Sequence, residues 1–406
     1  MVERLSCTVM PYAWGSRTAI AELTGRPAPT AGPEAELWMG AHPVAPSRLR
    51  RGDREESLAE IVARDPDREL GAEVRAAFGD RLPFLLKVLA AEEPLSIQAH
   101  PTTDQARAGF DDEERRGVPR DAATRNYRDA SHKPELLCAL TPFYALCGFR
   151  RAADTLRLFD ALDVEEIAPY IAPLRSAPDP SGLGAAFRAL MTMPDAARAH
   201  VVSTVVAACE KHAGVFVNEC GWAVRLSQLY PGDVGVVSAL LLNLVRLAPG
   251  EAIYLGAGNL HAYLGGVGVE IMASSDNVLR GGLTKKHVDV PELMKVLDFA
   301  DGPIEILRAR PLDAHESVYD TPAAEFRLSR ITLSSDDGRV ERVVRGPEVV
   351  LCTDGPVTLR GNAGGAPGLP LGRGSSAFIP ACTGGYTVER PIPGTGNLYR
   401  ATVNLT

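Results

Sequence analysis

The sequence predicts a mainly β protein that is interrupted by one helical insertion. The first hundred residues alternate short strand-like pieces with Pro and Gly turns, and short strands with turn dipeptides return beyond about Leu312. Between them, the segment from about Arg151 to Ala213 changes toward helix. Because side chains repeat every two residues in a strand and every 3.6 in a helix, these changes of pattern indicate changes of element type.

Two helical runs interrupt the first strands, at 57–64 and 70–78. The first opens with Ser57 and carries a glutamate three positions later, which is typical of a capping box. The run 84–89 then predicts an apolar strand that contains Lys87. Since an interior lysine is costly to bury without an anion nearby, Lys87 either faces an active site or reaches solvent from a strand end.

The apolar residues of the helical part form one stripe with spacing i, i+1, i+4, i+5 and i+8. They are Val201, Val202, Val205, Val206 and Cys209. We expect strands to resume near Gly235 in a run that suits a buried sheet, with a turn at Pro249–Gly250. The dipeptides Asp337–Gly338 and Asp354–Gly355 predict further turns between strands.

A faint internal repeat links the two strand-rich parts. Residues 250–261 (GEAIYLGAGNLH) align with residues 374–385 (GSSAFIPACTGG), so that Gly385 takes the place of His261. The last histidine of the chain is His315. This pattern favours a second β-barrel that lacks a metal site.

Composition limits the class of protein. A chain of 406 residues with 45% hydrophobic content can bury sizeable cores, and its length suggests two or three domains. A net charge of −8 argues against nucleic acid as a partner, so an anionic substrate would need a local basic pocket. We find no signal peptide and no apolar run long enough to cross a membrane, and we expect a cytoplasmic protein.

Three separated stretches carry side chains that suit a metal ion. In an extended strand Gln98 and His100 project from the same face, together with Ser96. Glu135 adds a carboxylate and His261 a second imidazole, which gives a mixed oxygen and nitrogen set that zinc accepts. Taken alone the alternation has a second interpretation, because polar residues also alternate on solvated strand faces.

The motifs around these residues resemble the signatures of type I phosphomannose isomerases, which are zinc enzymes of the cupin superfamily. The first motif is met by Tyr127, Asp129, His132, Lys133, Pro134 and Glu135. The second is met by His261, Ala262, Tyr263, Glu270, Met272, Ala273, Ser275, Asp276, Asn277, Arg280, Gly282, Thr284 and Lys286. Two positions depart from it, since Gly281 stands where alanine is usual and Lys285 where proline is usual.

The resemblance implies a fold and a division into domains. A cupin-type jelly-roll barrel is expected to form the catalytic domain from residues 1–150 and 218–317. The helical insertion is expected at 151–217, and a second, metal-free cupin-like barrel at 318–406.

The resemblance also implies a zinc-dependent aldose-ketose isomerase that interconverts mannose 6-phosphate and fructose 6-phosphate through an enediolate. One zinc per chain would be bound by Gln98, His100, Glu135 and His261. In the family the residue matching Arg280 is catalytic, and a planar, permanently charged donor suits a developing anion.

The remaining roles stay open from the sequence. Candidates for the proton carrier are Glu270, His132 and Lys133. For substrate binding we expect Ser96 and Lys286 to contact the phosphate, with Lys87 as a helper and Asp276 as a further contact, because hydroxyl and ammonium groups can satisfy phosphate oxygens.

Two other classes of function compete with this interpretation. A metal-dependent cupin oxygenase needs a redox-active iron with open positions, and Gln98 in the ligand set counts against it. A non-catalytic sugar-phosphate sensor would not need Arg280. We expect a small-molecule sugar phosphate as the only partner, with neither nucleic acid nor membrane, while the oligomeric state stays open and includes a monomer.

Overall fold

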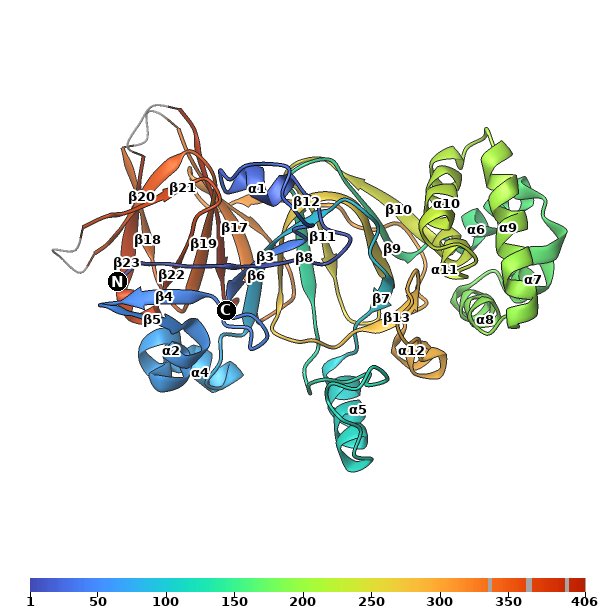
Figure 1. Ribbon diagram of the computed structural model, residues 1–406, viewed down its shortest axis with the longest axis horizontal. Helices are drawn as coiled ribbons and strands as arrows, with labels where there is room; N and C mark the ends of the chain where they lie inside the picture. Colours follow the sequence, from blue (N-terminus) through green and yellow to red (C-terminus); the bar gives the residue numbers. More distant parts are fainter. Residues whose placement is uncertain (335–337, 363–366, 391–393, 406) are drawn as a thin grey trace.

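The computed structural model describes residues 1–334, 338–362, 367–390 and 394–405. Three regions follow one another along its long axis (Figure 1): β-sheets formed mainly by the C-terminal part, a central sheet, and a group of helices at the far end. Sheets dominate two of these regions and helices the third, so the predicted mainly β class with a helical insertion is confirmed.

The central region is built on an eleven-stranded sheet whose main path runs β14-β11-β8-β12-β6-β3-β2. Its strands are β2 (Thr8–Met10), β3 (Glu36–Gly40), β6 (Phe84–Ala91), β7 (Ile97–Ala99), β8 (Glu135–Ala139), β9 (Phe143–Phe149), β10 (Leu242–Leu247), β11 (Glu251–Leu255), β12 (His261–Ala273), β13 (Leu279–Gly282) and β14 (Leu307–Arg308). The long strand β12 pairs with β6, β7, β8 and β9. The predicted apolar strand around Lys87 is β6, which is buried throughout.

The helical region lies between β9 and β10. It consists of α6 (Ala152–Leu162), η1 (Glu165–Ile167), α7 (Ala168–Ser176), α8 (Pro180–Met191), α9 (Asp195–Lys211), α10 (Val217–Leu229), α11 (Gly235–Ser238) and η2 (Ala239–Leu241). The stripe predicted in α9 is confirmed, because all five of its residues are buried.

The prediction that strands resume at Gly235 is wrong, since residues 235–241 are helical and β10 begins at Leu242. A short, fully apolar run fits a buried helix as well as a buried strand, so periodicity alone does not separate them. A side chain at position 235 would lie only 2.6 Å from the backbone nitrogen of Leu283, so a close backbone approach fixes this glycine.

Two further sheets lie at the opposite end. The seven-stranded sheet contains β1 (Glu3–Arg4), β15 (Arg310–Pro311), β16 (Glu316–Tyr319), β17 (Arg327–Leu333), β19 (Glu348–Asp354), β22 (Ser376–Ile379) and β24 (Gly396–Thr402). The four-stranded sheet contains β18 (Arg339–Val343), β20 (Pro356–Gly361), β21 (Leu369–Gly372) and β23 (Gly385–Glu389). The predicted turn at Gly355 connects β19 in one sheet to β20 in the other, while Asp337 lies outside the described residues.

Smaller elements cover the sheets. They are α1 (Ala19–Leu23), the hairpin β4 (Arg48–Arg51) and β5 (Arg54–Ser57), α2 (Leu58–Arg64), α3 (Pro66–Leu70), α4 (Ala72–Phe78), α5 (Thr103–Arg115), α12 (Val290–Val296) and η3 (Ala381–Thr383). The predicted capping box is confirmed at the start of α2, where Ala59 N donates to Ser57 Oγ (3.2 Å) and Ser57 N donates to Glu60 Oε2 (3.3 Å).

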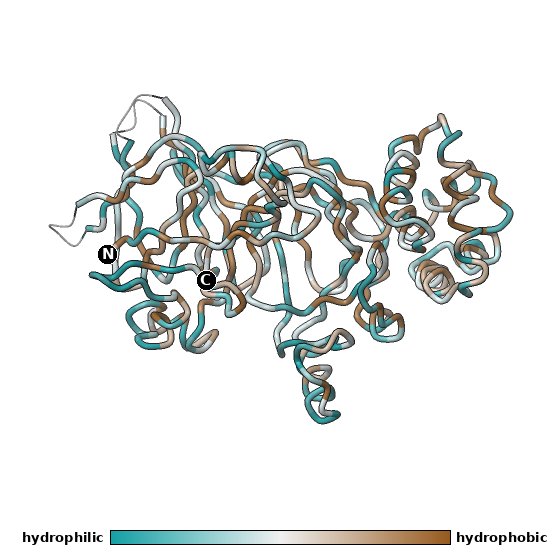
Figure 2. Tube along the Cα trace, in the orientation of Figure 1, coloured by the Kyte–Doolittle hydropathy of each residue, from teal (hydrophilic) through white to brown (hydrophobic). Residues whose placement is uncertain are grey.

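Hydropathy follows this arrangement. In Figure 2 the strands of the sheets carry long brown stretches, whereas α5, which extends away from the sheet, is largely teal. One apolar cluster joins the first part of the chain to the last, since Leu58 and Ile61 of α2 share it with Leu328 and Val349. The division into the four predicted domains stays a prediction. Among the described residues, no helix has the length and apolar character needed to span a membrane.

A buried ionic network holds the two C-terminal sheets together. Arg400 Nε donates to Glu348 Oε2 (2.8 Å), and its Nη1 donates to Glu316 Oε1 (3.0 Å). Tyr386 from the smaller sheet also donates to Glu348 (3.1 Å), and Arg342 Nε lies 2.8 Å from Glu316 Oε2. The network thus joins β16, β19 and β24 of the larger sheet to β18 and β23 of the smaller one.

We predict that Arg400→Met lowers the free energy of unfolding by about 3–5 kcal/mol, because it leaves a buried carboxylate without its cation. Urea unfolding followed by circular dichroism measures this change. Arg64→Met is the matched control, since Arg64 forms an exposed pair with Glu56 and its loss should leave the unfolding curve unchanged. Equal curves for the two variants would contradict the prediction.

Candidate active site

Three buried side chains meet at one end of β12. The ligand atoms of His100, Glu135 and His261 all lie within 4.8 Å of one another. Glu135 stands between the imidazoles, with Oε1 3.4 Å from His100 Nε2 and Oε2 3.5 Å from His261 Nε2. Strand pairing brings these residues together, because β12 pairs with β7 at His261 and Gln98, and Glu135 of β8 pairs with Leu255 of β11, six residues before His261.

Backbone carbonyls orient both imidazoles. His100 Nδ1 lies 2.6 Å from the carbonyl oxygen of Asn277, and His261 Nδ1 lies 3.0 Å from that of Asn259. Since a carbonyl only accepts, each Nδ1 carries the proton and each Nε2 keeps its lone pair for the centre of the cluster. This arrangement is typical of metal-binding histidines.

The cluster fits a divalent cation. His100 Nε2 and Glu135 Oε2 are buried and lack a hydrogen-bond partner among the described residues. Burial lowers the pKa of His100 to about 4, so its imidazole is neutral at neutral pH. Although burial opposes it, Lys133 and His100 hold the pKa of Glu135 well below its usual range. The Gln98 amide lies 3.4 Å from His261 Nε2, so rotating this amide by half a turn would offer its oxygen to the same ion.

A cavity of about 580 Å³ adjoins the cluster. Nine of the twelve predicted site residues line it, and these are Lys87, Ser96, Gln98, Lys133, Glu135, Glu270, Asp276, Arg280 and Lys286. His100 and His261 are almost fully buried beside it. The stretches that carry the two motifs, 127–135 and 261–286, therefore line the same cavity.

The predicted interior Lys87 is paired rather than solvated. Its Nζ lies 3.1 Å from Glu270 Oε2 and 3.5 Å from Glu36 Oε1. Burial lowers the pKa of Lys87, but the two carboxylates outweigh it and raise the pKa above its usual range. Tyr263 donates to the other oxygen of Glu270 (2.9 Å), and burial raises the pKa of Glu270.

A cluster of cations forms another wall of the cavity. Arg128, Arg280 and Lys286 lie there, and within the described part of the chain none of the three has a carboxylate at salt-bridge distance. Burial lowers the pKa of Lys286, and the charges of Arg280 and Arg128 lower it further. Burial and then Arg128 also lower the pKa of Arg280. An anion in the cavity would relieve this repulsion.

Two loops that carry the signature residues are fastened together. The side-chain oxygen of Asn277 accepts from Arg128 N (2.7 Å), and its amide donates to the carbonyls of Asp129 (2.7 Å) and Ser131 (2.9 Å). Ser275 Oγ donates to Asp129 Oδ1 (2.9 Å). Because the Asn277 carbonyl also holds His100, the same residue positions a candidate ligand and the loop that bears Arg128.

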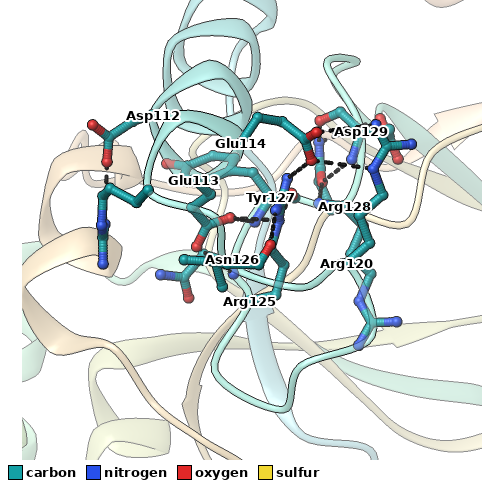
Figure 3. A network of polar contacts seen from close by, with 12 residues as sticks. Asp112, Glu113, Glu114, Arg120, Arg125, Asn126, Tyr127, Arg128 and Asp129 are labelled. Carbon is teal, nitrogen blue, oxygen red and sulfur yellow. Dashed lines mark hydrogen bonds and ion pairs between the residues drawn. The ribbon is translucent and has the colours of Figure 1, made fainter.

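A second polar network fixes the start of that loop against α5 (Figure 3). Glu113 accepts from Asn126 N (3.0 Å) and from Tyr127 N (2.8 Å), and it pairs with Arg125 at 3.0 Å. Arg125 Nη2 also donates to Glu114 (2.8 Å). The buried arginine and glutamate thus hold the backbone just before Arg128.

The structure places His132 away from the other candidates. It is not among the residues that line the cavity, and its Nε2 lies 2.6 Å from Glu325 Oε1, between β16 and β17. Asp276 lines the cavity 3.5 Å from the buried His42. Sequence reasoning missed Arg128 and Glu36 as site residues. Arg128 lies within the first motif, which could have signalled it, whereas Glu36 lies in a short apolar strand with no motif of its own.

Comparison with known proteins agrees with this site. Residues 2–152 match the family model of the type I phosphomannose isomerase catalytic domain. The chain is 40% identical over 402 residues to mannose-6-phosphate isomerase of Escherichia coli K12, covering 98% of this chain and 99% of the relative. It is 34% identical to the human enzyme of the same name, covering 93% of each chain.

Solved structures agree as well. A crystal structure of mannose 6-phosphate isomerase from Salmonella typhimurium, bound to fructose 6-phosphate and zinc, superposes over the whole of both chains with a TM-score of 0.89 and 36% identity. A zinc-bound structure of mannose 6-phosphate isomerase gives 0.90 and 37% over the same coverage. With this identity along nearly its entire length, the chain belongs to the type I mannose-6-phosphate isomerase family.

Proposed function

We propose that this protein is a zinc-dependent isomerase that interconverts mannose 6-phosphate and fructose 6-phosphate. The observation that carries the proposal is the buried cluster of His100, Glu135 and His261 beside a cavity whose cations Arg128, Arg280 and Lys286 have no carboxylate partner among the described residues. The relative from Salmonella typhimurium binds zinc and fructose 6-phosphate, and its fold matches along the whole chain. Gln98, His100, Glu135 and His261 would hold the ion.

Moving a carbonyl between C1 and C2 of a sugar transfers one proton between these carbons and creates negative charge on the enediolate oxygens. A bound zinc supplies a Lewis acid that polarises oxygens without changing its oxidation state. Arg280, half-buried on β13 opposite Gln98, would stabilise the developing anion. Lys286 and Ser96 would bind the phosphate, with Arg128 as a further cation on the same wall.

The geometry narrows the choice of proton carrier. Glu270 and Lys133 line the cavity, whereas His132 pairs with Glu325 outside it. Lys133 Nζ lies 3.0 Å from Glu135 Oε1, so it first serves as the partner of a proposed ligand. Glu270, whose pKa burial raises above its usual range, is the better matched acid or base. We therefore favour Glu270 and assign His132 a role in holding its loop to the C-terminal part.

We also propose that the two C-terminal sheets form a second cupin-like barrel without a metal site. The aligned repeat supports this, since both copies run from a strand through a turn to a new strand, and β12 starts at His261 where β23 starts at Gly385. The network of Arg400 with Glu348 and Glu316 lies in this part of the chain and pairs its buried charges with one another.

We predict that the purified protein contains about one zinc per chain and that a chelator abolishes ketose formation from mannose 6-phosphate. His261→Ala should lose both zinc and activity, because it removes a nitrogen donor from a buried site. Elemental analysis and a coupled isomerase assay measure the two quantities. His200→Ala, which changes an exposed histidine on α9, should retain both. Full activity of metal-free His261→Ala would contradict the proposed function.

We predict different kinetic effects for the two cavity cations Arg280 and Lys286. Arg280→Ala should lower kcat roughly a hundredfold, the scale of losing one preorganised donor to a developing oxyanion. Lys286→Ala should chiefly raise KM, because an anchor used equally in both states does not change the chemical step. Steady-state kinetics at fixed zinc content distinguishes them, with Lys211→Ala on the exposed face of α9 as control. An Arg280→Ala variant that keeps its kcat would contradict the assigned role.

A further inference from the structure

A row of side chains crosses three neighbouring strands on the cavity side of the sheet. Trp38 of β3 and Glu270 of β12 both pair in register with Lys87 of β6. Glu36 precedes Trp38 by two residues on β3, so its side chain points to the same face. All four residues line the cavity.

Glu36 is fixed from two sides. Trp38 Nε1 donates to its Oε2 (2.7 Å), and its Oε1 lies 3.5 Å from Lys87 Nζ. The ammonium group lies 5.2 Å from the centre of the Trp38 ring. The side chains of Glu36 and Lys87 are 8% and 7% exposed, so water screens this pair little.

Three buried carboxylates line the cavity, on Glu36, Glu135 and Glu270, and two buried ammonium groups lie among them, on Lys87 and Lys133. The other buried cation of the lining, Arg125, is paired with Glu113 and Glu114. Lys133 is paired with Glu135, which leaves Lys87 shared by the other two carboxylates. Lys87 Nζ donates a hydrogen bond to Glu270 Oε2 (3.1 Å) and forms an ion pair with Glu36 Oε1 (3.5 Å).

We propose that Glu36 is a positioning residue of the isomerase: it shares the ammonium group of Lys87 with Glu270 and thereby controls the charge and the proton of Glu270. The inference rests on the proposed function and on Glu270 as acid or base. Glu36 itself binds neither metal nor phosphate in this scheme. If Glu36 lost its charge, the ammonium group of Lys87 would pair with Glu270 alone and would stabilise the ionised form of Glu270.

The direction of the pH effect follows from the charges that face Glu270. These are Lys87 from β6, Glu36 from β3, Glu135 and Lys133 from β8 and the segment before it, and Tyr263 from β12 itself. Burial raises the pKa of Glu270, Lys87 lowers it, and the negative charge of Glu36 raises it. Removing that charge therefore lowers the pKa, and the limb of the pH–rate profile that Glu270 sets moves to lower pH.

The test compares the pH dependence of kcat for the zinc-loaded wild type, Glu36→Gln and Glu36→Asp. Glutamine keeps the size of the side chain and an acceptor for Trp38 but removes the charge. For Glu36→Gln we expect the limb of the pH–rate profile that Glu270 sets to move down by about one pH unit. We also expect kcat at the optimum to fall roughly tenfold, as when a residue that orients a functional side chain is removed. KM for mannose 6-phosphate and zinc content should stay within about twofold, because phosphate and metal contacts are unchanged.

Two variants keep the test decisive. Glu36→Asp retains the charge with a shorter reach, so the limb should stay in place while kcat falls. Glu348→Gln is the matched control, because Glu348 is also buried, paired with a cation and bound by a tyrosine, but in the C-terminal sheets. It should lower stability and leave the pH profile unchanged.

The outcomes separate this inference from the proposed function. A zinc-loaded wild type that does not isomerise mannose 6-phosphate would refute the function itself. An active wild type whose limb is unmoved in Glu36→Gln would overturn the positioning role. If Glu36→Gln does not fold, a wild-type kcat in Glu36→Asp would overturn it instead.

Discussion

The backbone pairing of β12 is the constraint on which the site depends. One strand of 13 residues pairs with four others, so the same strand fixes His261 at its start and Glu270 near its end. Register in a sheet is strict, because a slip of one residue turns every side chain to the opposite face. The metal cluster and the Lys87 network are therefore coupled, although they use different side chains.

Charge balance is the second organising factor. A buried carboxylate or ammonium group costs several kcal/mol unless it is paired, so the interior must supply partners at contact distance. Around the cavity the charges are paired unevenly, since Lys87 contacts two carboxylates, while Arg128, Arg280 and Lys286 contact none in the part of the chain that the structure describes. A divalent cation at the cluster of His100, Glu135 and His261 and an anionic substrate beside Arg280 would supply the missing opposite charges. The C-terminal sheets instead satisfy Arg400 internally, which suits a purely structural part.

The sequence revealed the ligands more readily than their surroundings. Glu135 and His261 lie in long motifs, and His100 was found from its alternation with Gln98 on one strand face. The sequence also raised an active site as one location for Lys87, because a lysine inside an apolar strand needs an anion. Its main partners could not be named, since Glu36 and Glu270 are brought to it only by the order of strands in the sheet. The short helices at 235–241 and the contact of His132 with Glu325 depend on packing between distant segments. Local periodicity in the sequence does not report such packing.

The helices inserted between β9 and β10 have a consequence for the route by which the chain folds. These two strands form an antiparallel pair with one register shift between Leu242 and Asn243, yet the whole helical region separates them in sequence. Closing so long a loop is entropically costly and slow, and compact structure inside the loop brings its ends together. We expect the helices to pack together first and thereby to bring β10 next to β9. Cys147 of β9 pairs in register with His261, so the metal cluster would be among the last features to assemble.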